Sequence, residues 1–199
     1  ILLKLFDDLY YMGGEWVGAY VLDTEEGLVL LDATERTDAY ERFLLPLQRK
    51  FGLEDQPVRA ILLTHGHYDH YLGAPEIAKQ TGCPVALTER DASYMVICEE
   101  NKGNKPPLMP HITRFLNDGD ALSFGSHTVW VQLAPGHTPG CVNFIADAHR
   151  GAETHRFVLM GGAAVFGPGN YAGEYPYGAK WAVDQALLFA GSCAALWRY

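Results

Sequence analysis

Residues 60–70 have the sequence Ala-Ile-Leu-Leu-Thr-His-Gly-His-Tyr-Asp-His, and the rest of the chain is organised around this stretch. The apolar run from Val58 to Leu63 is typical of a strand buried on both faces. Open α/β sheets place their ligand sites at the carboxyl ends of such strands. Imidazoles and carboxylates are groups that Zn²⁺ takes as ligands. The candidate metal ligands in this stretch are His65, His67, Asp69 and His70.

Length, composition and charge restrict the class of protein. With 199 residues, 48% of them hydrophobic, the chain suits a soluble globular fold, and we assign residues 1–199 to a single domain. The net charge of −9 and the lack of a Lys/Arg-rich block argue against nucleic acid as a partner. No apolar run is long enough to cross a bilayer, so we expect no membrane partner. A small-molecule substrate is the expected partner.

Cellular location is predicted from the cysteines and the start of the chain. The start has neither the basic region nor the long apolar region of a signal peptide. No Cys-x-x-Cys spacing is present, which favours reduced thiols and a cytoplasmic location. The cysteines are Cys83, Cys98, Cys141 and Cys193.

The first half of the chain predicts an α/β layer. A helical pattern, with Pro46 inside it, extends from Thr37 to Phe51 between an opening β-meander and the central strand. Two further helices and a short strand follow the ligand-bearing stretch. The predicted meander strands are Tyr10 to Met12, Val17 to Leu22 and Leu28 to Leu31. The later elements are the helices Ala74 to Gln80 and Glu89 to Glu100, with the strand Pro84 to Leu87 between them.

The second half predicts another sheet. We expect three strands to begin this sheet and two more to follow, with a final amphipathic helix from Trp181 to Trp197. His149 and His155 flank a polar hairpin between the last two strands, and we interpret both as solvated. The predicted strands are Ile112 to Leu116, Ala121 to Phe124, Thr128 to Leu133, Cys141 to Asp147 and Arg156 to Met160.

Two other residues are candidates for the site. His137 stands in Gly-His-Thr-Pro-Gly at 136–140, directly after an apolar strand, where Pro and Gly fix the backbone. A histidine presented in this way is a candidate metal ligand. Asp32 ends the third meander strand. Its carboxylate either caps the next segment or supports the metal site through a ligand.

The motifs at 65–70 and 136–140, in this order, resemble those of the metallo-β-lactamase superfamily of metal-dependent hydrolases. The resemblance implies an α/β fold that forms a four-layer αβ/βα sandwich, with metals held at one edge between two sheets. By position, it implies that His65, His67 and His137 bind a first Zn²⁺. It also implies that Asp69 and His70 contribute to a second site, and that Asp69 orients the attacking hydroxide as the catalytic residue.

The chain departs from the family pattern in two places, and one of these departures favours a particular subclass. Many superfamily hydrolases have a Gly-Asp whose carboxylate bridges both metals, where this chain has Gly161-Gly162-Ala163-Ala164. The third subclass of metallo-β-lactamases also lacks that carboxylate and resembles this chain best. The family supplies a last histidine from a strand that would follow Tyr199. We therefore expect two zinc ions in the complete protein and a chain that lacks its last strand and helix.

The resulting expectation is a zinc-dependent hydrolase whose metal-bound hydroxide attacks a carbonyl, with a β-lactam amide as substrate. The alternatives are hydrolysis of another ester, thioester or lactone on the same fold, and a non-enzymatic zinc-binding relic. A closed site with four protein ligands would favour the relic. A β-lactamase role would imply export to the periplasm or secretion, in place of the cytoplasm.

Overall fold

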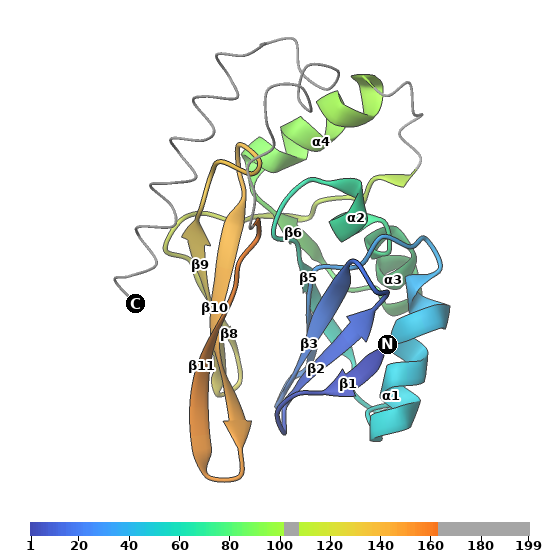
Figure 1. The fold of residues 1–199 in the computed structure, drawn as a ribbon, viewed down its shortest axis with the longest axis vertical. Helices are drawn as coiled ribbons and strands as arrows, with labels where there is room; N and C mark the ends of the chain where they lie inside the picture. Colours follow the sequence, from blue (N-terminus) through green and yellow to red (C-terminus); the bar gives the residue numbers. More distant parts are fainter. Residues whose placement is uncertain (102–107, 163–199) are drawn as a thin grey trace.

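A computed structural model describes residues 1–101 and 108–162, in which two sheets pack face to face and helices cover the outer face of the first (Figure 1). The two sheets and the helices belong to an αβ/βα sandwich, as the sequence predicts. In the described residues, no helix is long and apolar enough to cross a membrane.

The first sheet has seven strands in sequence order. Its first four strands pair antiparallel as a meander, and the pairs from β4 to β7 are parallel. Parallel strands bring their carboxyl ends to one edge of the sheet. The strands are β1 (Leu2–Lys4), β2 (Leu9–Gly13), β3 (Gly18–Thr24), β4 (Gly27–Leu31), β5 (Val58–Leu62), β6 (Val85–Leu87) and β7 (Arg114–Phe115).

The second sheet has four antiparallel strands in the order β11-β10-β9-β8. At one end of the sandwich, the backbone N–H of Val142 donates to the carbonyl of Thr64 at 2.9 Å. This bond places the end of β5 beside the connection from β9 to β10. The strands are β8 (Ala121–Phe124), β9 (His127–Leu133), β10 (Val142–Arg150) and β11 (Glu153–Leu159).

The helices lie in two places. α1 and α3 cover the outer face of the first sheet, whereas α2 and α4 lie near the edge where β5 and β6 end (Figure 1). A π-helical turn, η1, precedes α1, and Pro46 occupies the first turn of α1, where its missing N–H is tolerated. The elements are η1 (Tyr40–Leu44), α1 (Leu45–Phe51), α2 (Tyr68–Tyr71), α3 (Ala74–Thr81) and α4 (Glu89–Asn101).

The core has two parts, one on each face of the first sheet. Leu28 and Leu30 pack with the helices, whereas Val29 and Leu31 pack against the second sheet, because successive side chains of a strand point to opposite faces. All four are fully buried. Each buried aliphatic side chain contributes about 1.5–3 kcal/mol through the hydrophobic effect. The central sheet is therefore held from both sides, which fixes the ends of its strands.

Most predicted strands and helices are confirmed, and one sheet assignment is wrong. The segment Ile112 to Leu116 was expected to begin the second sheet. Its strand β7 instead pairs in parallel with β6, matching Ala86 with Arg114 and Leu87 with Phe115. A two-residue strand carries no pattern that distinguishes the sheets. β1 and α2 were not predicted, and the helix expected from Trp181 to Trp197 lies outside the described residues.

Gly27 should be intolerant of any side chain. It has a φ of +124°, and a Cβ added there would lie 2.2 Å from the carbonyl oxygen of Pro57. We expect Gly27→Ala to lower the free energy of unfolding by about 3 kcal/mol, from overpacking and backbone strain. Gly52→Ala is the control, because Gly52 also has positive φ but no atom within 4 Å of its Cβ position. Urea unfolding measures the free energy of unfolding of each variant. An equal loss in the two variants would contradict this prediction.

Candidate metal centre

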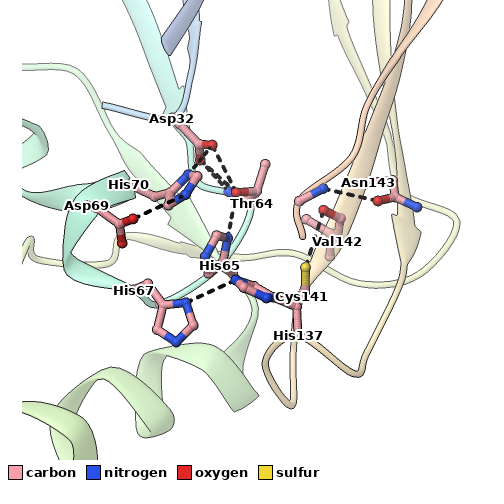
Figure 2. Close-up of polar contacts among 12 residues, drawn as sticks. Asp32, Thr64, His65, His67, Asp69, His70, His137, Cys141, Val142 and Asn143 are labelled. Carbon is pink, nitrogen blue, oxygen red and sulfur yellow. Dashed lines mark hydrogen bonds and ion pairs between the residues drawn. The ribbon is translucent and has the colours of Figure 1, made fainter. Parts of the chain in front are cut away.

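Three histidines converge at the edge where β5 ends, as the sequence predicts. His65 follows β5, His67 immediately precedes α2, and His137 lies between β9 and β10 (Figure 2). One nitrogen from each ring lies within 4.8 Å of the others. His65 and His137 are buried, with 0% and 8% exposure. The fold thus joins two motifs that are separated by about a third of the chain.

The chemistry of His65 fits a metal ion. Its Nδ1 lies 2.9 Å from the hydroxyl oxygen of Thr64, while its buried Nε2 has no hydrogen-bond partner among the residues that the structure describes. Burial, followed by the neighbouring His70, His67 and His137, holds the pKa of His65 well below its usual value. The ring is therefore neutral, which is the form that ligates metals. A ring nitrogen of this kind, beside two other imidazoles, has the environment of a metal ligand.

The ring of His67 is held from both sides. Its Nδ1 lies 3.1 Å from Nε2 of His137, and its Nε2 lies 2.7 Å from the hydroxyl oxygen of Tyr94 on α4. Tyr94 is buried. A second hydrogen bond of this kind fixes the tautomer and orientation of a ligating imidazole. Tyr94 therefore selects Nδ1 of His67 as the nitrogen that faces the cluster.

Asp69 and His70 lie next to this cluster on α2. The ring centroids of His65 and His70 are 4.1 Å apart, and Nε2 of His70 lies 3.9 Å from Asp69 Oδ2. Burial alone would lower the pKa of His70, but the charge and hydrogen bond of Asp32 raise it on balance. The opposite nitrogen, Nδ1, contacts Asp32 at 2.8 Å. Nε2 is thereby turned toward Asp69, which suits the predicted second pair of ligands.

Asp32 supports the site and does not cap a helix. Its buried carboxylate accepts hydrogen bonds from the backbone N–H of Thr64 at 2.8 Å and from the Thr64 hydroxyl at 2.9 Å, and it also contacts His70. Its φ of +66° lies in the left-handed region, which non-glycine residues rarely adopt. Such strain persists where surrounding contacts enforce it. Of the two interpretations left open by the sequence, the supporting role is therefore confirmed.

A second buried carboxylate joins the two ligand-bearing loops. Asp91, in the first turn of α4, accepts hydrogen bonds from the backbone N–H of Gly66 at 2.7 Å and of Gly140 at 2.5 Å. The Thr138 hydroxyl donates to it at 2.6 Å. Burial, partly opposed by these hydrogen bonds, raises the pKa of Asp91 to about 6. This carboxylate therefore fixes the position of the His65 loop relative to the His137 loop.

Gly162 packs closely against one of the candidate ligands. A Cβ at Gly162 would lie 2.3 Å from Cβ of His137. Only glycine fits there without displacing a ligand. In the described part of the chain, the metal-ligating group at this edge consists of three histidines.

In the described structure, neither His149 nor His155 belongs to the metal-ligating group at this edge. The side chain of His155 is 42% exposed and contacts Glu153 near the β10–β11 hairpin. That of His149 is 41% exposed, but its ring is paired with Asp8, so the interpretation of His149 as simply solvated is wrong. The pairing joins residues 141 apart in sequence, which local pattern cannot reveal.

Sequence reasoning missed three residues of the site: Thr64, Asp91 and Tyr94. Thr88 and Asp91 have the Thr-x-x-Asp spacing of a helix start, and the Thr88 hydroxyl accepts from the Asp91 N–H at 3.2 Å. That spacing indicates a cap and gives no sign of contacts with Gly66 or Gly140. The roles of Asp91 and Tyr94 depend on where α4 packs.

With this geometry established, comparison with known proteins defines the class. A family model described as the metallo-beta-lactamase superfamily matches residues 17–152. The chain belongs to the metallo-beta-lactamase superfamily and is a metal-dependent hydrolase.

The proteins that are similar to this chain carry the names of different enzymes. The chain is 30% identical over 137 residues to a probable metallo-hydrolase, YflN, of Bacillus subtilis, covering 59% of this chain and 48% of that protein. It is 25% identical over 142 residues to hydroxyacylglutathione hydrolase of Idiomarina loihiensis, covering 71% of this chain and 44% of that protein. Among solved structures, BJP-1, a subclass B3 metallo-beta-lactamase of Bradyrhizobium japonicum, superimposes with a TM-score of 0.76 at 26% identity. That match covers 94% of this chain and 71% of BJP-1. The chain spans about half the length of the two curated relatives.

Removing the Tyr94 hydroxyl should weaken metal binding without unfolding the protein. We expect Tyr94→Phe to lower zinc affinity about tenfold, the lower end of the usual effect of losing such a hydrogen bond. Competition with a chromophoric chelator measures this affinity. Ser93→Ala is the control, because Ser93 is exposed on the same helix. Unchanged zinc affinity in Tyr94→Phe would show that the hydroxyl does not position His67.

The raised pKa of Asp91 predicts a pH-dependent stability. Between pH 4 and 6 the folded protein retains a proton that the unfolded chain, with the ordinary value of 3.8, has already lost. The free energy of unfolding should therefore fall as pH rises through this window, by up to about 3 kcal/mol. Urea unfolding of the metal-free protein measures this. Because Asp91→Asn cannot titrate, the stability difference between wild type and variant should shrink from pH 4 to pH 7. A constant difference would mean that Asp91 is ionised throughout.

Proposed function

We propose that the protein is a zinc-dependent hydrolase that cleaves the amide of a β-lactam. The arrangement of the centre carries this proposal: His65, His67 and His137 form one ligand set, and Asp69 with His70 offers another beside it. The sequence has Gly161-Gly162-Ala163-Ala164 where many hydrolases of the superfamily have a Gly-Asp with a bridging carboxylate. The third subclass of metallo-β-lactamases has this pattern, and the similarity to BJP-1 supports it.

Three histidine ligands would leave one coordination position of a zinc ion open to water. A zinc ion held by three neutral imidazoles lowers the pKa of a bound water to about 7, so that a nucleophile is available at neutral pH. A closed structural site would need a fourth protein ligand. The three-histidine group in the described residues therefore favours the enzyme over a non-enzymatic relic.

The chain's own groups have distinct tasks in this proposal. Asp69, with a side chain 35% exposed, can accept a hydrogen bond from a water that approaches the substrate carbonyl. Asp32 holds the ring of His70, and Asp91 holds both ligand loops. Because these supports are buried, the site is organised before substrate binds, which lowers the cost of reaching the transition state.

A second candidate function is hydrolysis of a thioester. The similarity to hydroxyacylglutathione hydrolase over 71% of this chain favours an acylated glutathione as the alternative substrate. Thioester and β-lactam carbonyls both need a nucleophile and a group that stabilises the developing oxyanion. The same metal centre therefore serves either reaction.

Substrate assays with metal removal test the function. We expect hydrolysis of a chromogenic cephalosporin, lost after chelation and restored by Zn²⁺. Asp69→Asn should lower kcat by at least about 100-fold through the loss of proton and hydrogen-bond handling. His67→Ala should lose both zinc and activity. His111→Ala, at an exposed histidine, is the control and should match the wild type.

The outcomes separate the candidates. Turnover of an acylglutathione thioester without turnover of the cephalosporin would replace the β-lactam proposal with the thioester one. Zinc-loaded protein that hydrolyses neither substrate would contradict both. Elemental analysis of the same samples gives the number of zinc ions per chain.

A further inference from the structure

A second group of metal-ligating side chains lies at the other end of the sandwich. Asp8 precedes β2, His127 is the first residue of β9, and His149 is near the end of β10. Their three ligand atoms lie within 4.8 Å of one another. His137 follows the opposite end of β9. The seven residues of β9 span roughly 20 Å, so the two groups are separate sites.

The three side chains share one point of contact. Oδ2 of Asp8 lies 2.9 Å from Nε2 of His127 and also contacts Nδ1 of His149. The His127 side chain is only 9% exposed, and its buried Nδ1 has no hydrogen-bond partner in the described structure. Its polar contact is therefore made through Nε2, toward the cluster. The other carboxylate oxygen of Asp8 accepts from the backbone N–H of His149 at 2.8 Å.

Charge around the cluster favours a cation. Burial would raise the pKa of Asp8, but hydrogen bonds from the backbone and ring of His149 and from the ring of His127 lower it on balance. The carboxylate is therefore ionised. Burial, and then the charge of Asp8, raise the pKa of nearby Asp23. Two imidazoles with one ionised carboxylate form a donor set suited to Zn²⁺.

The backbone holds these donors in place without help from an ion. The N–H of Asp7 donates to the carbonyl of His149 at 2.7 Å, and the N–H of Gly151 donates to the Asp7 carboxylate at 2.7 Å. The N–H of Asp23 donates to the Asp8 carbonyl at 2.8 Å. The connection between β1 and β2 is thus docked on the end of β10. A ligand set that is already ordered loses little conformational entropy when an ion binds.

We propose that Asp8, His127 and His149 bind a divalent transition-metal ion, with Zn²⁺ as the expected species and water completing its coordination. The ion would link the first sheet, through the β1–β2 connection, to strands β9 and β10 of the second. His149, with its side chain 41% exposed, gives the site access to solvent. This site is independent of the hydrolytic centre and does not rest on its proposed substrate. The rival explanation is a metal-free triad in which both imidazoles donate to Asp8.

Metal stoichiometry in a protein without the first centre tests the proposal. In the full chain carrying His67→Ala and His137→Ala, we expect one equivalent of Zn²⁺ or Co²⁺ to bind after chelation and dialysis. Adding His149→Asn should abolish this equivalent. Adding His155→Asn instead should leave it, because the side chain of His155 is 42% exposed and lies on neighbouring β11. Titration calorimetry and the visible absorption of Co²⁺ measure binding, and circular dichroism confirms folding.

A measurement in the otherwise unaltered chain covers the case in which the background variant does not fold. There, His149→Asn should lower the zinc content by one equivalent and remove part of the zinc-dependent rise in melting temperature. Catalytic turnover should stay within about twofold of wild type, since His149 lies away from the catalytic centre. An unchanged zinc content and an unchanged rise in melting temperature would establish the metal-free triad and overturn the proposal.

Discussion

The centre depends on one buried charge, the carboxylate of Asp91. Three donors from two loops meet on it: the N–H groups of Gly66 and Gly140 and the hydroxyl of Thr138. Burying a carboxylate is costly, and its pKa of about 6 reflects that cost even with three hydrogen bonds in place. Loss of any donor would leave the charge less well compensated. The two ligand loops are therefore held in register by the need to satisfy this group.

Asp32 has a similar role on the other side of the centre. Its carboxylate organises Thr64, which contacts His65, and it also holds His70 directly. The positive φ of Asp32 shows that the surrounding contacts impose a backbone conformation that an aspartate would not choose alone. Such strain is tolerated because the residues before it, Val29 to Leu31, are fully buried between two layers. The stability of the buried sheet thus compensates for the backbone strain at Asp32.

The fold of this protein does not define its substrate. The chain superimposes on a subclass B3 metallo-beta-lactamase. A curated relative that is similar over 71% of this chain is a hydroxyacylglutathione hydrolase. One scaffold can serve several reactions, because specificity comes from the residues around the reacting atoms. The close approach of Gly162 to His137 is one local feature of this centre.

The sequence by itself determined the central strand and the three histidines that converge at its edge. These follow from short-range signals: an apolar run, a two-residue histidine spacing, and Pro and Gly around His137. Only the tertiary structure decided the place of β7, the support from Asp32, and the contacts of Asp91 and Tyr94. It alone brought Asp8 together with His127 and His149, which lie 119 and 141 residues further along the chain. The physical reason is that a buried polar group takes whichever partners packing brings to it, and packing joins residues whose separation in sequence carries no local signal.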